Sequence, residues 1–341
     1  MKENKTKYEP IFKQFQEEDK NIESIKDFCD TENGIIKDIR YKGKQCLAKV
    51  TEKSDSIDYA KNLKGPNLVK IYKILETEYD KKLYNMIVME KAVLRDLGML
   101  NEHLKRSNCF RLYNKPFFEI IGNNLVKFLT KGIVKGLETL ERNELVHYNI
   151  KPSNLLITSE LKIKISDFSF LINIKNKENL KLPETRGYVT PEFFKNKNVS
   201  PEDAKKQDYF ALGASLFFFR RGDQLLTKRK YNDDLSEDRL IDLLQRDIAL
   251  IQSNPLYDSK FVDFICDLMR YVPEERPNIE EIYRNEWLNE DLNDLFLLNS
   301  IYLKEEEDKF IRELLKSDFT LKKSKEINEQ EINRANFKFV E

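Results

Sequence analysis

The stretch that decides the fold runs His147-Tyr-Asn-Ile-Lys-Pro-Ser-Asn-Leu-Leu156. It follows an apolar stripe at helical spacing and precedes a short run of strand-forming residues. A second polar stretch, Ile165-Ser-Asp-Phe-Ser169, begins ten residues after Leu155. Both polar stretches therefore follow a long helix, and a short strand is expected after the first. The stripe of that helix comprises Leu125, Phe128, Leu129, Ile133, Leu137 and Leu140.

Further motifs follow in order along the chain. Thr185-Arg-Gly-Tyr188 and Thr190-Pro-Glu192 precede Asp208, which lies in an apolar helical pattern, and Glu275-Arg-Pro277 comes later. With the two polar stretches, they make the chain resemble the eukaryotic protein kinase family, serine/threonine type, over about residues 22–290. Any one match is weak, but all of them in this order and spacing are specific. The resemblance implies an α+β bilobal fold with a small β-rich N-lobe and a large helical C-lobe.

Ahead of these motifs, we expect a short tail and a strand-rich lobe. Residues 1–21 are polar and are predicted to be an N-terminal tail, with a short docked helix as the alternative. Residues 22–92, the predicted N-lobe, contain strand-like runs, two of which flank the turn-like Lys42-Gly43-Lys44 and predict a hairpin. The docked-helix alternative rests on three apolar residues at helical spacing: Ile11, Phe12 and Phe15.

The rest of the chain is predicted to be helical. Residues 93–289 form the expected C-lobe, and residues 290–341 form a C-terminal helical extension outside the family pattern. A lone helix of this length is marginal in water, so the apolar stripe of the extension must pack on something. The alternatives are the large lobe of the same chain and a groove on a partner protein. The stripe comprises Phe310, Ile311, Leu314 and Leu315.

Composition narrows the classes of function. The 341 residues include 59 basic and 59 acidic side chains, so charge favours neither nucleic acid nor an anionic membrane as a partner. The N-terminus lacks the apolar core of a signal peptide, and the longest apolar run, 209–219, is about half the length that spans a bilayer. The scattered cysteines lack zinc-ligand spacing and favour a reducing compartment. We therefore expect a cytoplasmic protein, with association with the cytoskeleton as a narrower alternative.

The family resemblance implies a nucleotide pocket in the N-lobe. Lys49 matches the strand lysine that holds the α- and β-phosphates. Counting back from it puts Gly34 at the third glycine of the phosphate-covering loop and Ile36 at the residue that packs on the adenine. The first two glycine positions carry Cys29 and Thr31, whose side chains would obstruct the approach of the backbone to a phosphate.

The same resemblance assigns the rest of the purine slot. Met89 matches the gatekeeper, and Glu90-Lys-Ala92 matches the hinge, whose backbone would bond an adenine. Ala48 and Leu156 would sandwich the purine together with Ile36. These apolar residues serve equally well as plain core.

The helix that should support Lys49 is predicted to be short. Alignment of 65–69 with the family's loop after that helix puts Ser56 at the position of the glutamate that aligns the lysine. Asp55 and Asp58 lie nearby, but they are shorter and would point differently. So few residues separate Lys49 from Ser56 that we expect a truncated helix without the ion pair of an active kinase.

The decisive substitution is Asn149, at the position of the catalytic aspartate. A kinase needs a carboxylate there to accept the proton of the substrate hydroxyl, and a carboxamide can only hydrogen-bond that hydroxyl. Loss of a positioned general base typically costs roughly 10²–10⁴ in rate.

Two regulatory positions also differ from the family pattern. Tyr148 replaces the arginine that pairs with a phosphorylated activation loop, and Ser169 replaces the glycine after Asp167-Phe168.

Three residues of the family's machinery are retained. Asn154 and Asp167 match the magnesium ligands, and Lys151 matches the residue that neutralises the transferred phosphate. Their retention fits residual binding of Mg-nucleotide and fits structural inertia equally well.

The sequence therefore predicts a pseudokinase, a catalytically inactive scaffold or allosteric partner. It requires no cofactor and binds ATP and Mg²⁺ weakly or not at all. Its expected partner is a protein, with 290–341 as the candidate binding segment, and neither nucleic acid nor a membrane. One alternative is an active or atypical serine/threonine protein kinase in which Asn149 orients the substrate hydroxyl. Another is a structural component of a larger assembly, such as a cytoskeletal array.

Overall fold

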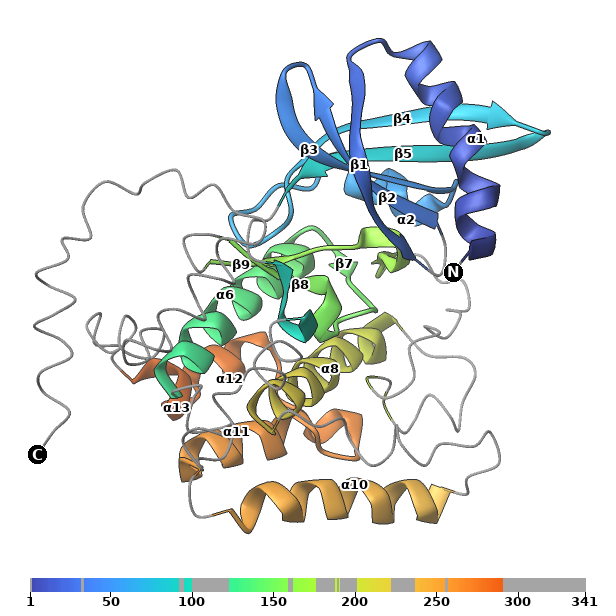
Figure 1. Ribbon diagram of the computed structural model, residues 1–341. Helices are drawn as coiled ribbons and strands as arrows, with labels where there is room; N and C mark the ends of the chain where they lie inside the picture. The colour runs from blue at the N-terminus through green and yellow to red at the C-terminus, as the bar shows by residue number, and fades with distance from the viewer. Residues whose placement is uncertain are drawn as a thin grey trace, which may run out of the picture.

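The computed structural model describes residues 2–31, 34–91, 95–99, 123–158, 162–175, 188, 190, 201–221, 237–254 and 257–290. Over these residues the chain folds into a small lobe built on an antiparallel sheet and a large, mainly helical lobe (Figure 1). This is the predicted α+β bilobal fold. Within the described ranges, no helix combines the length and the apolar character that crossing a membrane requires.

A five-stranded antiparallel sheet, in the order β1-β2-β3-β5-β4, organises the small lobe. Two connections are two-residue turns with positive φ at both residues, 50° and 75° at Lys42 and Gly43, and 48° and 60° at Asp80 and Lys81. Such turns match the twist of the strands they join, and the predicted hairpin is confirmed. The strands are β1 (Ile22–Thr31), β2 (Gly34–Tyr41), β3 (Lys44–Glu52), β4 (Ile71–Tyr79) and β5 (Lys82–Glu90).

Helix α1 (Lys2–Glu18) packs along one face of this sheet (Figure 1). An ion-pair cluster pins it there, because Lys37 Nζ on β2 lies 2.6 Å from Glu9 Oε2 of the helix and 2.7 Å from Asp27 Oδ1 of β1. Of the two alternatives for residues 1–21, the structure therefore has the docked helix, and the prediction of a tail is wrong over 2–18. The helix buries Tyr8, Ile11, Phe12 and Phe15 against the sheet.

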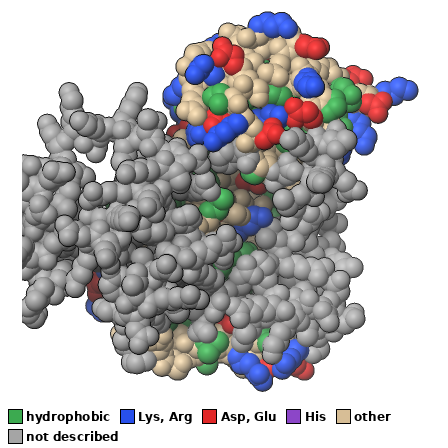
Figure 2. Space-filling model, in the orientation of Figure 1, with side chains coloured by type: hydrophobic (Ala, Val, Ile, Leu, Met, Phe, Trp, Pro, Cys, Tyr) green, Lys and Arg blue, Asp and Glu red, His purple; other side chains and the backbone are tan. Residues whose placement is uncertain are grey.

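Strand alternation gives the sheet two faces with different surroundings. On β3, Cys46, Ala48 and Val50 belong to the buried cluster under α1. Lys49 directly follows Ala48 on the strand, so its side chain lies on the opposite face, where it pairs with Asp167 of the large lobe. We call the first side the α1 face and the second the cleft face. On the side of the molecule drawn in Figure 2, basic and acidic side chains are interspersed over the small lobe.

The large lobe is built around helix α6 (Asn123–Arg142), whose buried residues follow the predicted spacing. Helix α8 shares this core and packs against α11. The other helices are α8 (Pro201–Arg221), α10 (Glu237–Gln252), α11 (Ser259–Leu268), α12 (Ile279–Arg284) and α13 (Glu286–Asn289). Two small ladders contain β6 (Arg95–Asp96), β7 (Leu145–Val146), β8 (Leu155–Ile157), β9 (Ile163–Ile165) and β10 (Ile172–Asn173).

The described part of the large lobe ends in an ion-pair cluster at Glu290. Glu290 Oε2 lies 2.6 Å from Lys127 Nζ, and Glu290 Oε1 lies 3.0 Å from Lys260 Nζ. Because the Lys127 side chain is only 4% exposed, it needs this partner, and Glu290 belongs to the lobe. The predicted extension after Glu290, with its stripe at 310–315, lies outside the described residues.

Candidate functional site

Two polar loops meet on the large-lobe side of the space between the lobes. The first, 147–154, leads from β7 through the 3-10 helix η1 (Pro152–Asn154) into β8. The second follows β9 and contains the 3-10 helix η2 (Phe168–Phe170). The Asn154 carbonyl accepts hydrogen bonds from Ser166 N at 2.9 Å and Ser166 Oγ at 3.0 Å. These bonds hold the two loops side by side.

Asp208 of helix α8 anchors the backbone of the first loop. Its Oδ2 accepts from His147 N at 2.7 Å, and its Oδ1 accepts from Tyr148 N at 2.8 Å. Tyr148 has a φ of 64°, and its amide and that of His147 both reach this one carboxyl group. The conformation of the loop is thus set by backbone bonds, which do not depend on the side chain at position 149.

The His147 ring joins the two loops. It is fully buried, and burial lowers the pKa of His147 to about 4, so the ring is neutral near pH 7. Nε2 lies 2.9 Å from the Ser166 carbonyl oxygen and therefore carries the proton and donates it. Nδ1 is then the acceptor for Asn149 N at 3.3 Å.

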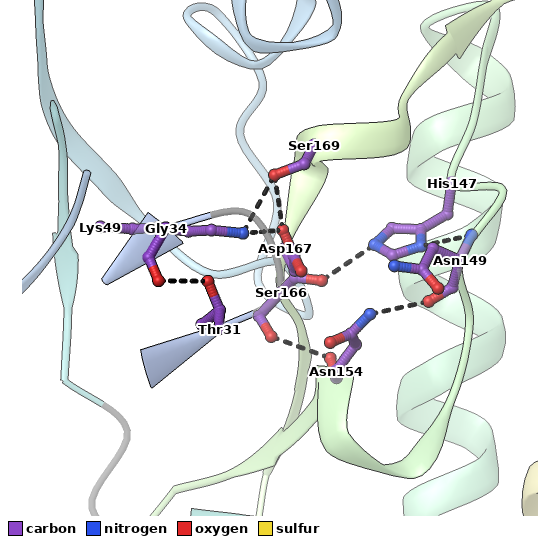
Figure 3. Close-up of polar contacts among 9 residues, drawn as sticks. All are labelled: Thr31, Gly34, Lys49, His147, Asn149, Asn154, Ser166, Asp167 and Ser169. Atoms are coloured by element: carbon purple, nitrogen blue, oxygen red, sulfur yellow. Dashed lines mark hydrogen bonds and ion pairs between the residues drawn. The ribbon is translucent and has the colours of Figure 1, made fainter. Parts of the chain in front are cut away.

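Asn149 comes next in this loop and lies beside His147 and Asn154 (Figure 3). It is 5% exposed, and its backbone carbonyl accepts a hydrogen bond from Asn154 Nδ2 at 2.8 Å. The loop around it is held by these hydrogen bonds and those to Asp208, yet its own side chain is a carboxamide. A carboxamide donates and accepts hydrogen bonds but takes up no proton near neutral pH.

Tyr148 stands at the position where the family pattern has an arginine. Its ring is 1% exposed and packs in a small apolar cluster with Val146 and Ala204, against which Phe170 and Ile172 also lie. Burial raises the pKa of the Tyr148 hydroxyl above its usual value. This position therefore holds a buried aromatic ring where an arginine would provide a cation.

Lys49 crosses from β3 to the second loop (Figure 3). Its Nζ lies 2.6 Å from Asp167 Oδ1 and 3.0 Å from Ser169 Oγ, and Ser169 Oγ donates to Asp167 Oδ1 at 2.8 Å. Burial alone would raise the pKa of Asp167, but the charge of Lys49 and the two hydrogen bonds hold it well below its usual value. Asp167 is thus ionised at any physiological pH.

The helix expected to support Lys49 is α2 (Asp55–Ala60), which has only six residues, as the spacing predicted. It buries Ile57 and Ala60 and packs near η2. Its two carboxylates lie in its first turn, and Asp58 pairs with Lys61. No carboxylate of α2 is among the hydrogen-bond or ion-pair partners of Lys49 in the described structure.

Gly34 has a local structural reason to be glycine. A Cβ added to it would lie 2.0 Å from the Val50 carbonyl oxygen, so the close approach of β2 to β3 excludes a side chain. Across the β1–β2 connection, Thr31 Oγ1 donates to the Gly34 carbonyl at 3.0 Å. Cys29 is exposed on β1.

The order of these parts along the chain, lysine strand, short helix, anchored loop and Asp-Phe-Ser turn, matches a known pattern. The family described as protein kinase domain matches residues 24–288. The chain belongs to the protein kinase family.

Several named kinases are similar to this chain. Serine/threonine-protein kinase cds1 of Schizosaccharomyces pombe is 27% identical over 239 residues, which cover 68% of this chain and 46% of the relative. Aurora kinase of the same organism is 25% identical over 232 residues, 68% of this chain and 57% of the relative. Interferon-induced, double-stranded RNA-activated protein kinase of Rattus norvegicus is 31% identical over 169 residues, 48% of this chain and 30% of the relative. The chain spans less than two thirds of the length of each.

The predicted purine slot of this kinase domain needs one correction. Ala48 is packed under α1 on the α1 face, so it does not line the cleft, and its assignment to the slot is wrong. The residue on the cleft face is Leu47, which pairs with Asp38 of β2 and Met89 of β5. The signal was available in the sequence, because counting back two residues from Lys49 along a strand reaches the same face.

The other slot residues fit the kinase arrangement better. Ile36 pairs with Lys49 in the β2–β3 ladder, so both lie on the cleft face. Met89 on β5 and Leu156 on β8 are partly buried and both pack against the core of the large lobe. Ala92, the last predicted hinge residue, lies outside the described residues.

The hinge is tied to both lobes by its side chains. Glu90 Oε1 accepts from Lys70 N at 2.6 Å and lies 2.5 Å from Lys164 Nζ of β9. Lys91 Nζ lies 2.6 Å from Oδ2 of Asp38, whose side chain is fully buried. The predicted hinge is thus an ordered link between β5 and the large lobe, at least through Lys91.

The residues predicted for magnesium have the donor chemistry that this ion prefers, which is hard oxygen ligands. Asn154 uses its Nδ2 for Asn149, which leaves its Oδ1 as an acceptor. Asp167 Oδ1 is taken by Lys49 and Ser169, and its ionised carboxylate retains Oδ2. Asn154 and Asp167 would therefore be the ligands of Mg²⁺, whose charge would neutralise nucleotide phosphates. Lys151, predicted to neutralise the same charge, is partly buried at the start of η1.

Proposed function

We propose that this kinase-family chain is a pseudokinase, a non-catalytic scaffold or allosteric module that binds another protein. The observation that carries the proposal is Asn149. Its loop has the anchoring bonds from Asp208, His147 and Asn154, so position 149 is held in place, and the group presented there is not a base. No rearrangement of an ordered loop would supply the missing carboxylate.

The N-lobe supports the same proposal independently. Lys49 is held by Asp167 and Ser169 and not by a helix glutamate, and α2 is too short to extend a carboxylate along the cleft. The first two positions of the phosphate-covering loop carry Cys29 and Thr31, whose side chains keep the backbone away from a phosphate. We therefore expect ATP and Mg²⁺ to bind weakly or not at all.

A second candidate function is an active or atypical serine/threonine kinase. It is favoured by Lys49 and Asp167 lying in contact across the cleft and by the amide oxygen of Asn154, which accepts no hydrogen bond from the described residues. In that case Asn149 would orient the substrate hydroxyl, and the proton would leave to solvent. A structural component of a cytoskeletal assembly is a third candidate, which shares the expectation of no turnover.

Phosphoryl transfer tests the proposal directly. The purified protein with labelled ATP, Mg²⁺ and generic protein substrates should transfer no more label than its Asp167→Ala variant. Asn149→Asp alone should not restore transfer, because the N-lobe defects remain. Label transfer that Asp167→Ala abolishes would establish the kinase and exclude the pseudokinase.

Thermal melting with ATP, with and without Mg²⁺, tests the pocket. A ligand at about 100 times its dissociation constant adds about 2.7 kcal/mol to the free energy of unfolding. We expect no such increase at micromolar ATP. A large increase that requires both Mg²⁺ and Asp167 would favour a nucleotide-regulated protein over an inert one.

The partner-binding part of the proposal concerns residues 290–341. The informative truncation ends the chain after Glu290, because removing Glu290 would leave the buried ammonium of Lys127 without its partner. Unchanged melting with loss of the co-purifying partner would support a docking segment. A lower melting temperature would support packing of the segment on its own lobe, and no change in either would remove the segment from the proposal.

A further inference from the structure

Ser169 stands where the family pattern has the glycine of the Asp-Phe-Gly turn, and its hydroxyl makes hydrogen bonds to two residues of the pocket. It lies on η2, within hydrogen-bond distance of both the Lys49 ammonium and the Asp167 carboxylate (Figure 3). We propose that Ser169 is the positioning residue of this pocket, which holds Lys49 in the cleft in place of the absent helix glutamate. The proposal rests on the kinase-type pocket of the proposed function and adds a role for one of its residues.

The three groups form a closed hydrogen-bonded triangle. Ser169 Oγ has one proton, which it donates to Asp167 Oδ1 at 2.8 Å, and its lone pairs accept from Lys49 Nζ at 3.0 Å. Lys49 Nζ completes the triangle with its own bond to Asp167 Oδ1 at 2.6 Å. Every contact pairs a donor with an acceptor, so the hydroxyl orientation is determined by its neighbours.

Lys49 needs such a holder because its side chain is only 6% exposed. A buried ammonium requires partners on more than one side, and a single carboxylate supplies them from one direction only. In kinases that keep the helix glutamate, that residue comes from the N-lobe. Here α2 offers Asp55 and Asp58 from its first turn, and Asp58 is engaged by Lys61.

A glycine at position 169 could not provide this contact, and it would also loosen the turn. Asp167 already has a φ of 63°, a left-handed conformation that its bond from Ser169 Oγ helps to retain. The serine hydroxyl therefore contacts both members of the Lys49–Asp167 pair. Its bond to Asp167 stiffens the turn, which would be more flexible with a glycine, and its bond to Lys49 orients the ammonium towards the cleft face.

The first experiment needs no nucleotide. Wild type, Ser169→Ala and Ser169→Thr are treated with a small amine-acetylating reagent, and the acetylation rate of Lys49 is followed by mass spectrometry. Lys73, exposed on β4, serves as the internal reference. We expect Ser169→Ala to acetylate several-fold faster at Lys49 with Lys73 unchanged, and Ser169→Thr, which keeps the hydroxyl, to resemble wild type. Equal Lys49 rates in wild type and Ser169→Ala would overturn the proposal.

The second experiment separates this role from general stability. Lys49 acts on phosphates, so Ser169→Ala should weaken binding of ATP about tenfold, as expected for one hydrogen bond to a charged group, and leave adenosine unaffected. Combined with Lys49→Met it should cause no additional loss. An equal loss for ATP and adenosine would reduce Ser169 to a structural residue and contradict the proposal. If wild type binds neither ligand, nucleotide binding drops out of the proposed function, and the acetylation rates still decide the role of Ser169.

Discussion

The two sides of the cleft depart from the kinase pattern in different ways. On the large-lobe side, the loops around His147 and Asp167 are anchored by Asp208, Ser166 and Asn154, and the position of the catalytic aspartate carries Asn149. On the small-lobe side, the architecture itself has changed. The supporting helix α2 is six residues long, and a seventeen-residue helix, α1, covers the opposite face of the sheet.

The difference has a physical basis. The large-lobe bonds run from side chains to backbone groups, so the loop keeps its shape whatever stands at position 149. A carboxamide at position 149 is therefore compatible with an undisturbed loop. In the small lobe, α2 buries Ile57 and Ala60, whereas α1 and the sheet share a larger buried cluster. Much of the apolar packing of the small lobe therefore lies on the α1 face.

The largest effect on the free energy of unfolding is expected for Phe15→Ala, which tests whether α1 stabilises the small lobe. Phe15 of α1 is completely buried against the sheet, and truncation of a buried phenylalanine typically costs about 3–5 kcal/mol. Urea unfolding should show a loss of that size. Ile25→Ala, at a 45% exposed side chain on β1 of the same lobe, is the control and should cost less than about 1 kcal/mol. Similar small losses for both variants would mean that α1 is not the brace of the small lobe.

A test on the large-lobe side uses pH. His147 has a pKa of about 4 in the folded chain, against about 6.5 when unfolded, so the unfolded state takes up a proton first as the pH falls. Its contribution to stability is complete above pH 6.5 and is lost between pH 6.5 and 4. One pKa unit corresponds to about 1.4 kcal/mol, so the loss should approach about 3 kcal/mol.

Unfolding measured across this pH range in His147→Gln provides the comparison. The glutamine amide can still donate to the Ser166 carbonyl but cannot titrate, so the pH-dependent loss should shrink by that amount. His103→Gln, at the other histidine of the chain, should follow wild type. If His147→Gln and wild type lose stability in parallel, the buried neutral ring is not the link between the two loops.

The smallest expected effect distinguishes the two faces of β3. Ala48→Val adds volume to the packed cluster under α1 and should cost about 1–3 kcal/mol. Leu47→Ile, one residue earlier on the cleft face, conserves volume and should cost less than about 1.5 kcal/mol. If Ala48→Val is neutral in unfolding but weakens ATP binding, Ala48 faces the cleft, and the assignment of the faces is reversed.

Patterns local in sequence predicted a large part of the fold. The hairpin at 42–44 and the buried stripe of α6 follow from residue order within a short stretch, and the shortness of α2 follows from the alignment of 65–69 with the family's loop. The motif order predicted the kinase family. The roles assigned to Lys151, Asn154 and Asp167 in phosphate and metal binding stay predictions, since nothing in the fold tests them.

What the sequence by itself determined is the chemistry at single positions, because residue type alone decides that Asn149 has no carboxylate and that Ser169 has a hydroxyl. Only the tertiary structure decided which groups those side chains meet. Lys49 and Asp167 are 118 residues apart, and no local pattern reports their contact. The element that covers Ala48 was likewise decided by the tertiary structure, since alternation along one strand says that Ala48 and Lys49 lie on opposite faces but not that a helix docks on the face of Ala48.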